Sequence, residues 1–209
     1  PITFSVHRLD RWLHLGACDP SMGKGEKAHP SAIVGGAYDR EKQQLHVIEA
    51  RIRRRVPSKL EADLIAFQRD FQALKIGFEN NNAYEHSRQT FVAAALRAGL
   101  ALPLIGLPAT VEREVRIEGM EPFITDAFAP RIVFDPGLTQ LLAELDSWPE
   151  KQAHHDYDGL CALYLLWEVC LRHGGAGAAS GFRSLRRRGG GYGEDVDTDD
   201  GLVGSRRMW

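Results

Sequence analysis

A strand-like stretch close to the N-terminus, WLHLGACD at residues 12–19, decides how the rest of the chain is interpreted. It is rich in apolar side chains and ends at the carboxylate of Asp19, which Pro20 follows. Short apolar runs that end in turn residues are typical of buried β-strands, so we predict a strand over residues 11–19. The position of Asp19 matters because functional groups of open α/β sheets gather just beyond the carboxyl ends of strands.

The residues that follow predict two further strands and then an alternation of helices and strands. Strands are expected at residues 31–38, 44–52, 75–80, 102–107 and 131–134. Helices are expected at residues 85–98, 138–145 and 158–172, with one more that follows Ser58 and a short one that precedes residue 131. Ser58 and Glu61 have the spacing of a capping box, and apolar residues follow from Leu60 to Leu74 at intervals of three and four. This order predicts an α/β fold with a mixed sheet flanked by helices.

Composition and charge exclude several classes of protein. The 209 residues are 44% hydrophobic, which is enough for a buried core, and 26 basic against 28 acidic residues give a formal net charge of −2. Such a balance argues against a chain that coats nucleic acid by bulk charge. The three cysteines have neither a disulfide-framework nor a zinc-site spacing, which indicates a reducing compartment. No apolar run is long enough for a membrane span.

The composition changes near Gly174. Residues 174–209 contain ten of the 21 glycines and few large aliphatic side chains. A segment of this kind buries too little apolar surface to offset its ordering entropy. We therefore predict a folded domain at residues 1–173 and a flexible tail, rich in Gly, Arg and Asp, at residues 174–209.

Three acidic residues stand where predicted elements begin or end. Asp19 closes the first strand, Glu79 lies at the end of the strand at residues 75–80, and Asp158 opens the last helix. If the first and fourth strands are neighbours, the three carboxylates face one crevice. They would then raise one another's pKa values unless a cation lies among them. Hard oxygen ligands suit Mg²⁺ or Mn²⁺, and two such ions about 4 Å apart promote phosphodiester hydrolysis.

Four segments of the chain resemble the nuclease domain of the large terminase subunits of tailed bacteriophages. They read LGACDPS at residues 15–21, IGFENN at 76–81, RIEGMEPFI at 116–124 and HDYDGLCAL at 155–163. The resemblance covers about residues 10–172. It implies a ribonuclease H-like fold and a metal-dependent endonuclease that cuts concatemeric phage DNA during genome packaging, with little sequence specificity, in the cytoplasm of the infected bacterial host.

The resemblance also implies roles for residues and partners. Asp19, Glu79 and Asp158 would bind two Mg²⁺ or Mn²⁺ ions as the catalytic set, with Asp156 as a further metal ligand. The implied partners are double-stranded DNA, an ATPase domain upstream in the same protein, the small terminase subunit and the portal.

The sequence departs from the family pattern around the last helix. The family often has two adjacent acids there, whereas Tyr157 separates Asp156 from Asp158, and Cys161 stands where a third acid is usual before Ala162. Which of the two aspartates is the essential ligand therefore stays open. The spacing to Ala162 favours Asp158.

Basic residues supply candidate contacts to DNA phosphates, which are electrostatic and independent of sequence. Candidates for DNA binding are Arg51, Arg53, Arg54, Arg55 and Lys59, and candidates for a supporting role at the metal site are Lys24 and His155. The alternative is that none of these residues has a functional role: the basic run is a solvated strand end, Lys24 is an ordinary loop lysine and His155 is an ordinary surface histidine.

Two other functions stay open. The pattern Gly16-x-x-Asp19-Pro20 also resembles Holliday-junction resolvases, which share the implied fold. The second alternative is a non-catalytic DNA-binding module, in which the acids are turn formers and helix caps and the basic run binds the DNA.

Overall fold

The computed structural model describes residues 7, 9–20, 29–80, 82–108, 110–148 and 157–174. The strands are β1 (Leu13–Asp19), β2 (Ser31–Asp39), β3 (Gln44–Arg53), β4 (Lys75–Asn80), β5 (Leu104–Pro108) and β6 (Ile132–Phe134). The helices are α1 (Pro57–Phe71), α2 (Asn82–Arg97), α3 (Arg113–Glu118), α4 (Glu121–Thr125), α5 (Thr139–Ser147) and α6 (Asp158–His173). The predicted tail lies outside the described residues apart from Gly174, so it stays a prediction.

The six strands form one mixed sheet in the order β5-β4-β1-β2-β3-β6. Strands β1, β2 and β3 are antiparallel neighbours, whereas β4 runs parallel to β1, β5 to β4, and β6 to β3. The expected adjacency of the first and fourth strands is confirmed: Ala17 pairs with Gly77 and Cys18 with Phe78. The carboxyl ends of β1 and β4 therefore meet at the same edge of the sheet.

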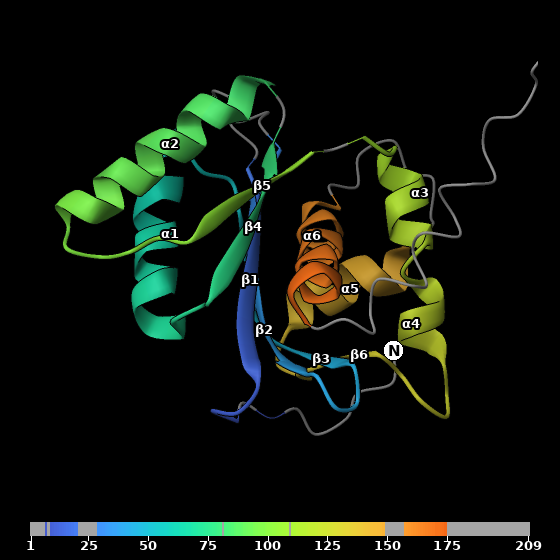
Figure 1. Ribbon diagram of the computed structural model, residues 1–209. Coiled ribbons are helices and arrows are strands. Elements are labelled where there is room, and N and C mark those ends of the chain that lie inside the picture. Colours follow the sequence, from blue (N-terminus) through green and yellow to red (C-terminus); the bar gives the residue numbers. More distant parts are fainter. Residues whose placement is uncertain are drawn as a thin grey trace, which may run out of the picture.

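Helices cover both faces of the sheet, so the protein has three layers (Figure 1). On one face, α1 and α2 bury apolar side chains that include Leu64, Phe67 and Phe91. On the other face, α6 lies against β1, β2 and β4, with α3, α4 and α5 outside it. The predicted α/β class, with helices flanking a mixed sheet, is confirmed.

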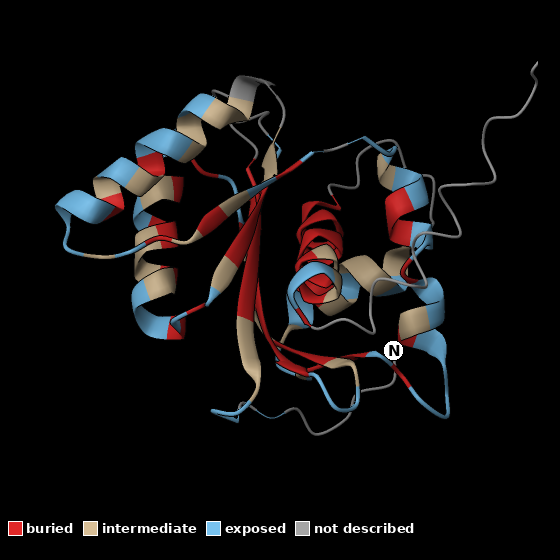
Figure 2. Cartoon of the chain, viewed as in Figure 1, coloured by how far each residue is buried: buried red, intermediate tan, exposed pale blue. Residues whose placement is uncertain are grey.

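Helix α6 is the central helix of the layer that also contains α3, α4 and α5, and it is buried along most of its length (Figure 2). Its close fit to the sheet depends on Gly77 of β4, where a Cβ atom would lie 2.7 Å from Val169 Cγ2 and 2.8 Å from Leu107 Cδ1. Interiors of proteins are close-packed, so a side chain at this position would displace the helix. Because α6 is fixed in this way, its first residue, Asp158, is held at the sheet edge.

The start of α1 differs from the prediction. The helix begins at Pro57 with Val56 as N-cap, and no side chain caps it, so the proposed capping box of Ser58 and Glu61 is wrong. Proline is favoured in the first turn because its fixed φ suits a helix and its missing N–H would have no partner there. The helix ends at Phe71, and its C-cap residue Gln72 has a φ of 55°. Leu74 therefore lies outside the apolar face and is exposed.

Other element ends agree with the predictions to within a few residues. Helix α2 begins three residues early, at Asn82, and ends before Gly99, whose φ of 71° fits the predicted C-terminal glycine. Two short helices, α3 and α4, occupy the place where one was expected. All three cysteines are buried free thiols. In the described part of the chain, no helix has the length and apolar character needed to cross a bilayer.

Candidate active site

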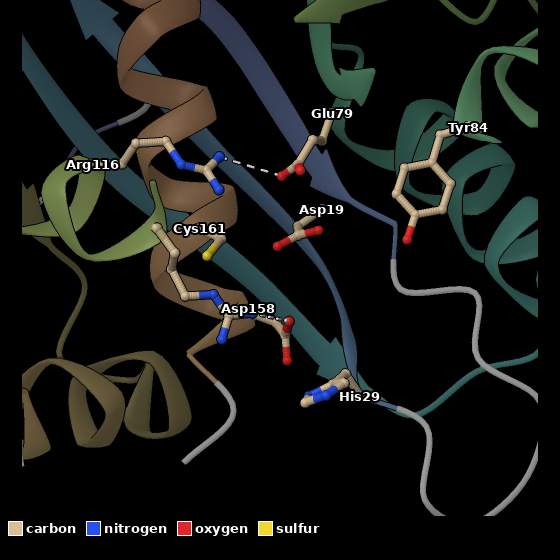
Figure 3. Close-up of a pocket in the computed structure, with 8 residues that line it drawn as sticks. Asp19, His29, Glu79, Tyr84, Arg116, Asp158 and Cys161 are labelled. Atoms are coloured by element: carbon tan, nitrogen blue, oxygen red, sulfur yellow. Dashed lines mark hydrogen bonds and ion pairs between the residues drawn. The ribbon is translucent and has the colours of Figure 1, made fainter. Parts of the chain in front are cut away.

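The structure brings the three carboxylates at the element ends together. Asp19, Glu79 and Asp158 line one pocket with a volume of about 180 Å³ (Figure 3). Asp19 comes from the end of β1, Glu79 from β4 and Asp158 from the first turn of α6. Positions about sixty and eighty residues apart in the sequence thus share one small cavity, as expected.

Strand geometry explains why Asp19 and Glu79 point to the same side of the sheet. Side chains alternate between the two faces of a strand, and Leu15 and Ala17 of β1 pack in the core on the α6 side. Asp19 follows two residues later and faces the same way. Since β4 is in parallel register with β1, Glu79 follows Gly77 toward the same side.

Burial and mutual repulsion shape the electrostatics of the pocket. Asp19 is 9% exposed and Asp158 is 2% exposed. Burial, together with the charges of Glu79 and Asp158, raises the pKa of Asp19 to about 8. The cause is general: burial and like charges both disfavour the ionised form of an acid. Without a bound cation, the pocket therefore favours the protonated form of Asp19 at neutral pH.

Two arginines of α3 lie among the carboxylates. Nη2 of Arg113 is 3.4 Å from Oδ1 of Asp158, and Nη1 of Arg116 is 3.4 Å from Oε2 of Glu79. Both arginines lower the pKa of Asp19, but less than burial and the neighbouring acids raise it. The cation that the carboxylate cluster requires is thus provided in part by the chain itself, which the sequence analysis did not foresee.

Solved structures of similar architecture share this arrangement of sheet and helices. The nuclease domain of the large terminase from bacteriophage SPP1, with bound Mn, is 19% identical at a TM-score of 0.50, with 76% of this chain and 87% of that chain covered. The P22 large terminase nuclease domain is 13% identical at a TM-score of 0.53, with coverage of 78% and 82%. The human cytomegalovirus terminase nuclease domain is 11% identical at 0.53, with coverage of 78% and 87%.

This chain has the ribonuclease H-like fold of the large terminase nuclease domains. The sequence itself matches no protein-family model and no curated protein. The likeness to the terminase nuclease domains is therefore one of architecture, and residue roles depend on the pocket described above.

The pocket of this terminase-like domain has the donor chemistry of a divalent-cation site. Three carboxylates on rigid elements supply the oxygen ligands that Mg²⁺ and Mn²⁺ prefer. Among the described residues, however, no three His, Cys, Asp or Glu side chains are already arranged around one point that an ion would occupy. Arg113 and Arg116 hold oxygens of Asp158 and Glu79, so the donors fit the ion in type while arginines engage two of them.

Cys161 also lines the pocket, one turn along α6 from Asp158. Burial and the charge of Asp19 raise the pKa of its thiol. A neutral thiol is a poor ligand for hard cations, because the thiolate is the ligating form. Cys161 therefore contributes no charge to the site.

Several predicted site residues are not tested. Asp156, His155 and Lys24 lie outside the described residues, and their roles stay predictions. The pocket contains Asp158. The preference for Asp158 over Asp156 as the essential ligand stays a prediction.

The basic run divides into buried and exposed members. The guanidinium of Arg55 is buried, with Nε 2.7 Å from Oδ2 of Asp63 and Nη1 donating to the backbone oxygen of Ser31 at 2.7 Å. It thus joins α1 to β2. The structure gives Arg55 a structural role in place of the predicted contact with DNA. Arg51 is also engaged, since it lies over the Phe67 ring and pairs with Glu49.

The remaining basic candidates are exposed. Arg53, Arg54 and Lys59 have exposed side chains, and Lys59 is 3.3 Å from Asp63. Arg53 pairs with Ser31, while Asp19 pairs with Ala32, so the end of β3 and the end of β1 lie at the same edge of the sheet. Arg53 therefore lies at the end of the sheet that holds the pocket, but it alternates with Ile52, which packs on the α6 side, so its side chain leaves the sheet on the opposite face.

Sequence reasoning missed four residues of the pocket wall: His29, Tyr84, Arg113 and Arg116. Burial and the three carboxylate charges raise the pKa of Tyr84, so its hydroxyl keeps its proton at neutral pH. The spacing of Arg113 and Arg116, one turn apart on a short helix, was the available signal, and Arg116 opens one of the segments that resemble the terminase family.

Proposed function

We propose that this chain is the nuclease domain of a phage large terminase subunit: a divalent-metal-dependent endodeoxyribonuclease that cuts concatemeric DNA during genome packaging. The observation that carries the proposal is the convergence of Asp19, Glu79 and Asp158 in one buried pocket at the edge of β1 and β4. The terminase-like fold supports it. So does the SPP1 nuclease domain, which was solved with bound Mn.

Asp19, Glu79 and Asp158 would hold the ions, with Asp156 as a further ligand. Divalent ions, when bound, would supply Lewis acidity at the scissile phosphate and make the attacking water more acidic. Mn²⁺ or Mg²⁺ fits the carboxylate set better than a softer ion, because the one thiol of the pocket is neutral.

The chain's own residues define the rest of the mechanism. The base of the pocket, formed by β1, β4 and α6, buries Asp19 and Asp158 and holds their carboxylates in place. Preorganised charged groups in such a site stabilise charge that develops in the transition state. Outside the pocket, Arg53, Arg54 and Lys59 would bind DNA phosphates, which gives affinity without sequence preference. Lys24 and His155 are proposed as supporting residues.

Double-stranded DNA is the substrate, and an upstream ATPase domain, the small terminase subunit and the portal are the proposed partners, in the cytoplasm of the infected bacterium. The site of cutting would be set by these partners, because we identify no base-reading element in the fold of the described residues.

Cleavage of supercoiled plasmid in Mn²⁺ by wild type and by Asp19→Ala, Glu79→Ala and Asp158→Ala tests this function. Each variant should lose at least about 100-fold in rate, a loss typical of removing a main catalytic group. Glu168→Gln on α6 is the matched control, since its carboxylate pairs with Arg172 outside the pocket. Undiminished cleavage by all three variants would refute the proposal. Preferential cleavage of four-way junctions over linear duplex would favour a junction resolvase instead.

A further inference from the structure

Two buried or half-buried arginines contact the carboxylates that the proposed function assigns to metal ions. Arg113 lies 3.4 Å from Asp158, and Arg116 lies 3.4 Å from Glu79. They come from one short helix, α3, that packs against α6. In Figure 3 the guanidinium of Arg116 points into the pocket toward Glu79. Any cation that binds these carboxylates must therefore share them with an arginine or replace it.

Arg116 is only partly used in this arrangement. Its side chain is 9% exposed and packs with Cζ 5.7 Å from the centre of the Tyr164 ring. Its Nε is buried and finds no hydrogen-bond partner among the described residues. A buried donor without a partner is costly, and guanidinium groups bind phosphate oxygens through two parallel N–H donors. Arg116 thus offers an unused donor inside a pocket that would receive a phosphate.

Charge balance argues in the same direction. The pocket is lined by three acids and, among its described lining residues, by two arginines. The arginines offset the charges of Asp158 and Glu79 while no divalent ion is bound. When divalent ions neutralise the carboxylates, the arginines lose their nearest anions in a poorly solvated site. A phosphodiester that enters the pocket is then the anion within reach of both groups.

Resting on the proposed function, we infer that Arg113 and Arg116 exchange partners during the reaction cycle. They neutralise Asp158 and Glu79 in the metal-free protein and bind the non-bridging oxygens of the scissile phosphate once the ions occupy the carboxylates. Both arginines are then positioning and charge-stabilising residues for cleavage, and both also compete with metal binding.

This exchange has a signature that a purely structural role lacks. Removing a positive charge beside a cation site should tighten binding of Mn²⁺, while removing a phosphate ligand should slow cleavage. Arg113→Gln and Arg116→Gln should each lower the Kd for Mn²⁺ by about threefold to tenfold in calorimetric titration without DNA. Their cleavage rates at saturating Mn²⁺ should fall by about 100-fold.

Two further variants make the comparison specific. Arg116→Lys keeps the charge but not the planar fork, so its Mn²⁺ affinity should stay close to that of wild type while cleavage stays impaired. Arg172→Gln on α6 removes an exposed arginine that pairs with half-buried Glu168 outside the pocket, and neither readout should change. Arg113, whose side chain is 34% exposed, keeps the test usable if Arg116→Gln fails to fold.

Each outcome supports or overturns the exchange. Tighter Mn²⁺ binding combined with slower cleavage supports it. Weaker or unchanged Mn²⁺ binding in both Gln variants, or unchanged cleavage, overturns it. If the carboxylate variants abolish cleavage but the arginine variants behave like Arg172→Gln, the exchange fails and the proposed nuclease function stands. If wild type binds no Mn²⁺ at these carboxylates, both fail.

Discussion

Asp19 and Glu79 lie at the same level near the ends of two neighbouring parallel strands, one residue beyond the pair formed by Cys18 and Phe78. Both side chains face α6, whose first residue, Asp158, completes the acidic lining of the pocket. Parallel pairing thus does more than join two strands, because it places two acids side by side in a buried site. The free-energy cost of that placement has measurable consequences.

The first consequence is a stability that falls as pH rises. The pKa of Asp19 is about 8 in the folded protein, mainly because of burial, against 3.8 as its ordinary value. Between these values the folded protein holds a proton that the unfolded chain has lost. The unfolded state therefore binds fewer protons, and the free energy of unfolding should decrease by several kcal/mol as pH rises through this window. Urea denaturation in EDTA from about pH 5 to about pH 9 measures the slope.

Asp19→Asn is the control for this pH dependence. The amide has nearly the shape of the protonated acid and does not titrate, so the variant should show a much flatter profile and be the more stable protein at alkaline pH. A variant with the same slope as wild type would show that other groups cause the pH dependence.

The second prediction separates Arg55 from Arg53. Arg55→Ala removes the buried member of the ion pair with Asp63 and the donor to the Ser31 carbonyl, so it should lower the free energy of unfolding by about 3 kcal/mol. Lys59 still lies beside Asp63 in this variant. Arg53→Ala, at an exposed position, should change stability by less than about 0.5 kcal/mol. Chemical denaturation of both variants measures the difference.

DNA affinity should show the opposite pattern. Arg53→Ala should weaken binding of duplex DNA and reduce its salt dependence by about one phosphate contact. Arg55→Ala, measured at a temperature where it is folded, should bind like wild type. Fluorescence anisotropy at several salt concentrations tests this, and a normal salt slope for Arg53→Ala would remove Arg53 from the proposed DNA path.

Much of the fold was predictable because local signals and long-range pairing agree. Apolar runs that end in Asp19 and Glu79 located two strands, and the apolar face from Leu60 to Phe71 located α1. The start of α1 was predicted wrongly because Ser58 and Glu61 match a capping box, while the backbone geometry of Pro57 determines where the helix begins. Sequence spacing alone does not distinguish these two ways of starting a helix.

The candidate site was predictable only in its acids. A carboxylate at a strand end is visible in the sequence. Arg113 and Arg116 reach the pocket because α3 docks on α6, and their spacing of one helical turn does not by itself predict that tertiary contact. For Arg55 the opposite happened: the sequence analysis named it as a candidate for DNA binding, and the structure buries it. A run of arginines is typical of a solvated surface, and its burial depends on Asp63, which lies on the next helix.

The third prediction concerns stabilisation by metal. A ligand that binds the folded protein and not the unfolded chain stabilises it in proportion to RT ln(1 + [L]/Kd), about 2.7 kcal/mol at 100 times the Kd. Mn²⁺ should therefore raise the Tm of wild type and relieve the destabilisation at alkaline pH, and EDTA should reverse both effects. Asp158→Asn should respond much less than the matched control Glu168→Gln. Equal shifts in Tm for both variants would place the ion outside this pocket.

The fourth prediction tests whether the fit of α6 on β4 positions the site. In Gly77→Val, the added Cβ alone would lie 2.7 Å from Val169 Cγ2 and 2.8 Å from Leu107 Cδ1, and the two methyl groups would add further clashes. Overpacking of this kind costs about 1–3 kcal/mol. Displacement of α6 would also move Asp158 away from Glu79, and a shift near 1 Å is enough to slow cleavage by about 100-fold. Ala98→Val, at an exposed position beyond α2, adds similar bulk without either effect. If Gly77→Val unfolds like wild type and cleaves plasmid at the wild-type rate, the contact between α6 and β4 does not position the carboxylates.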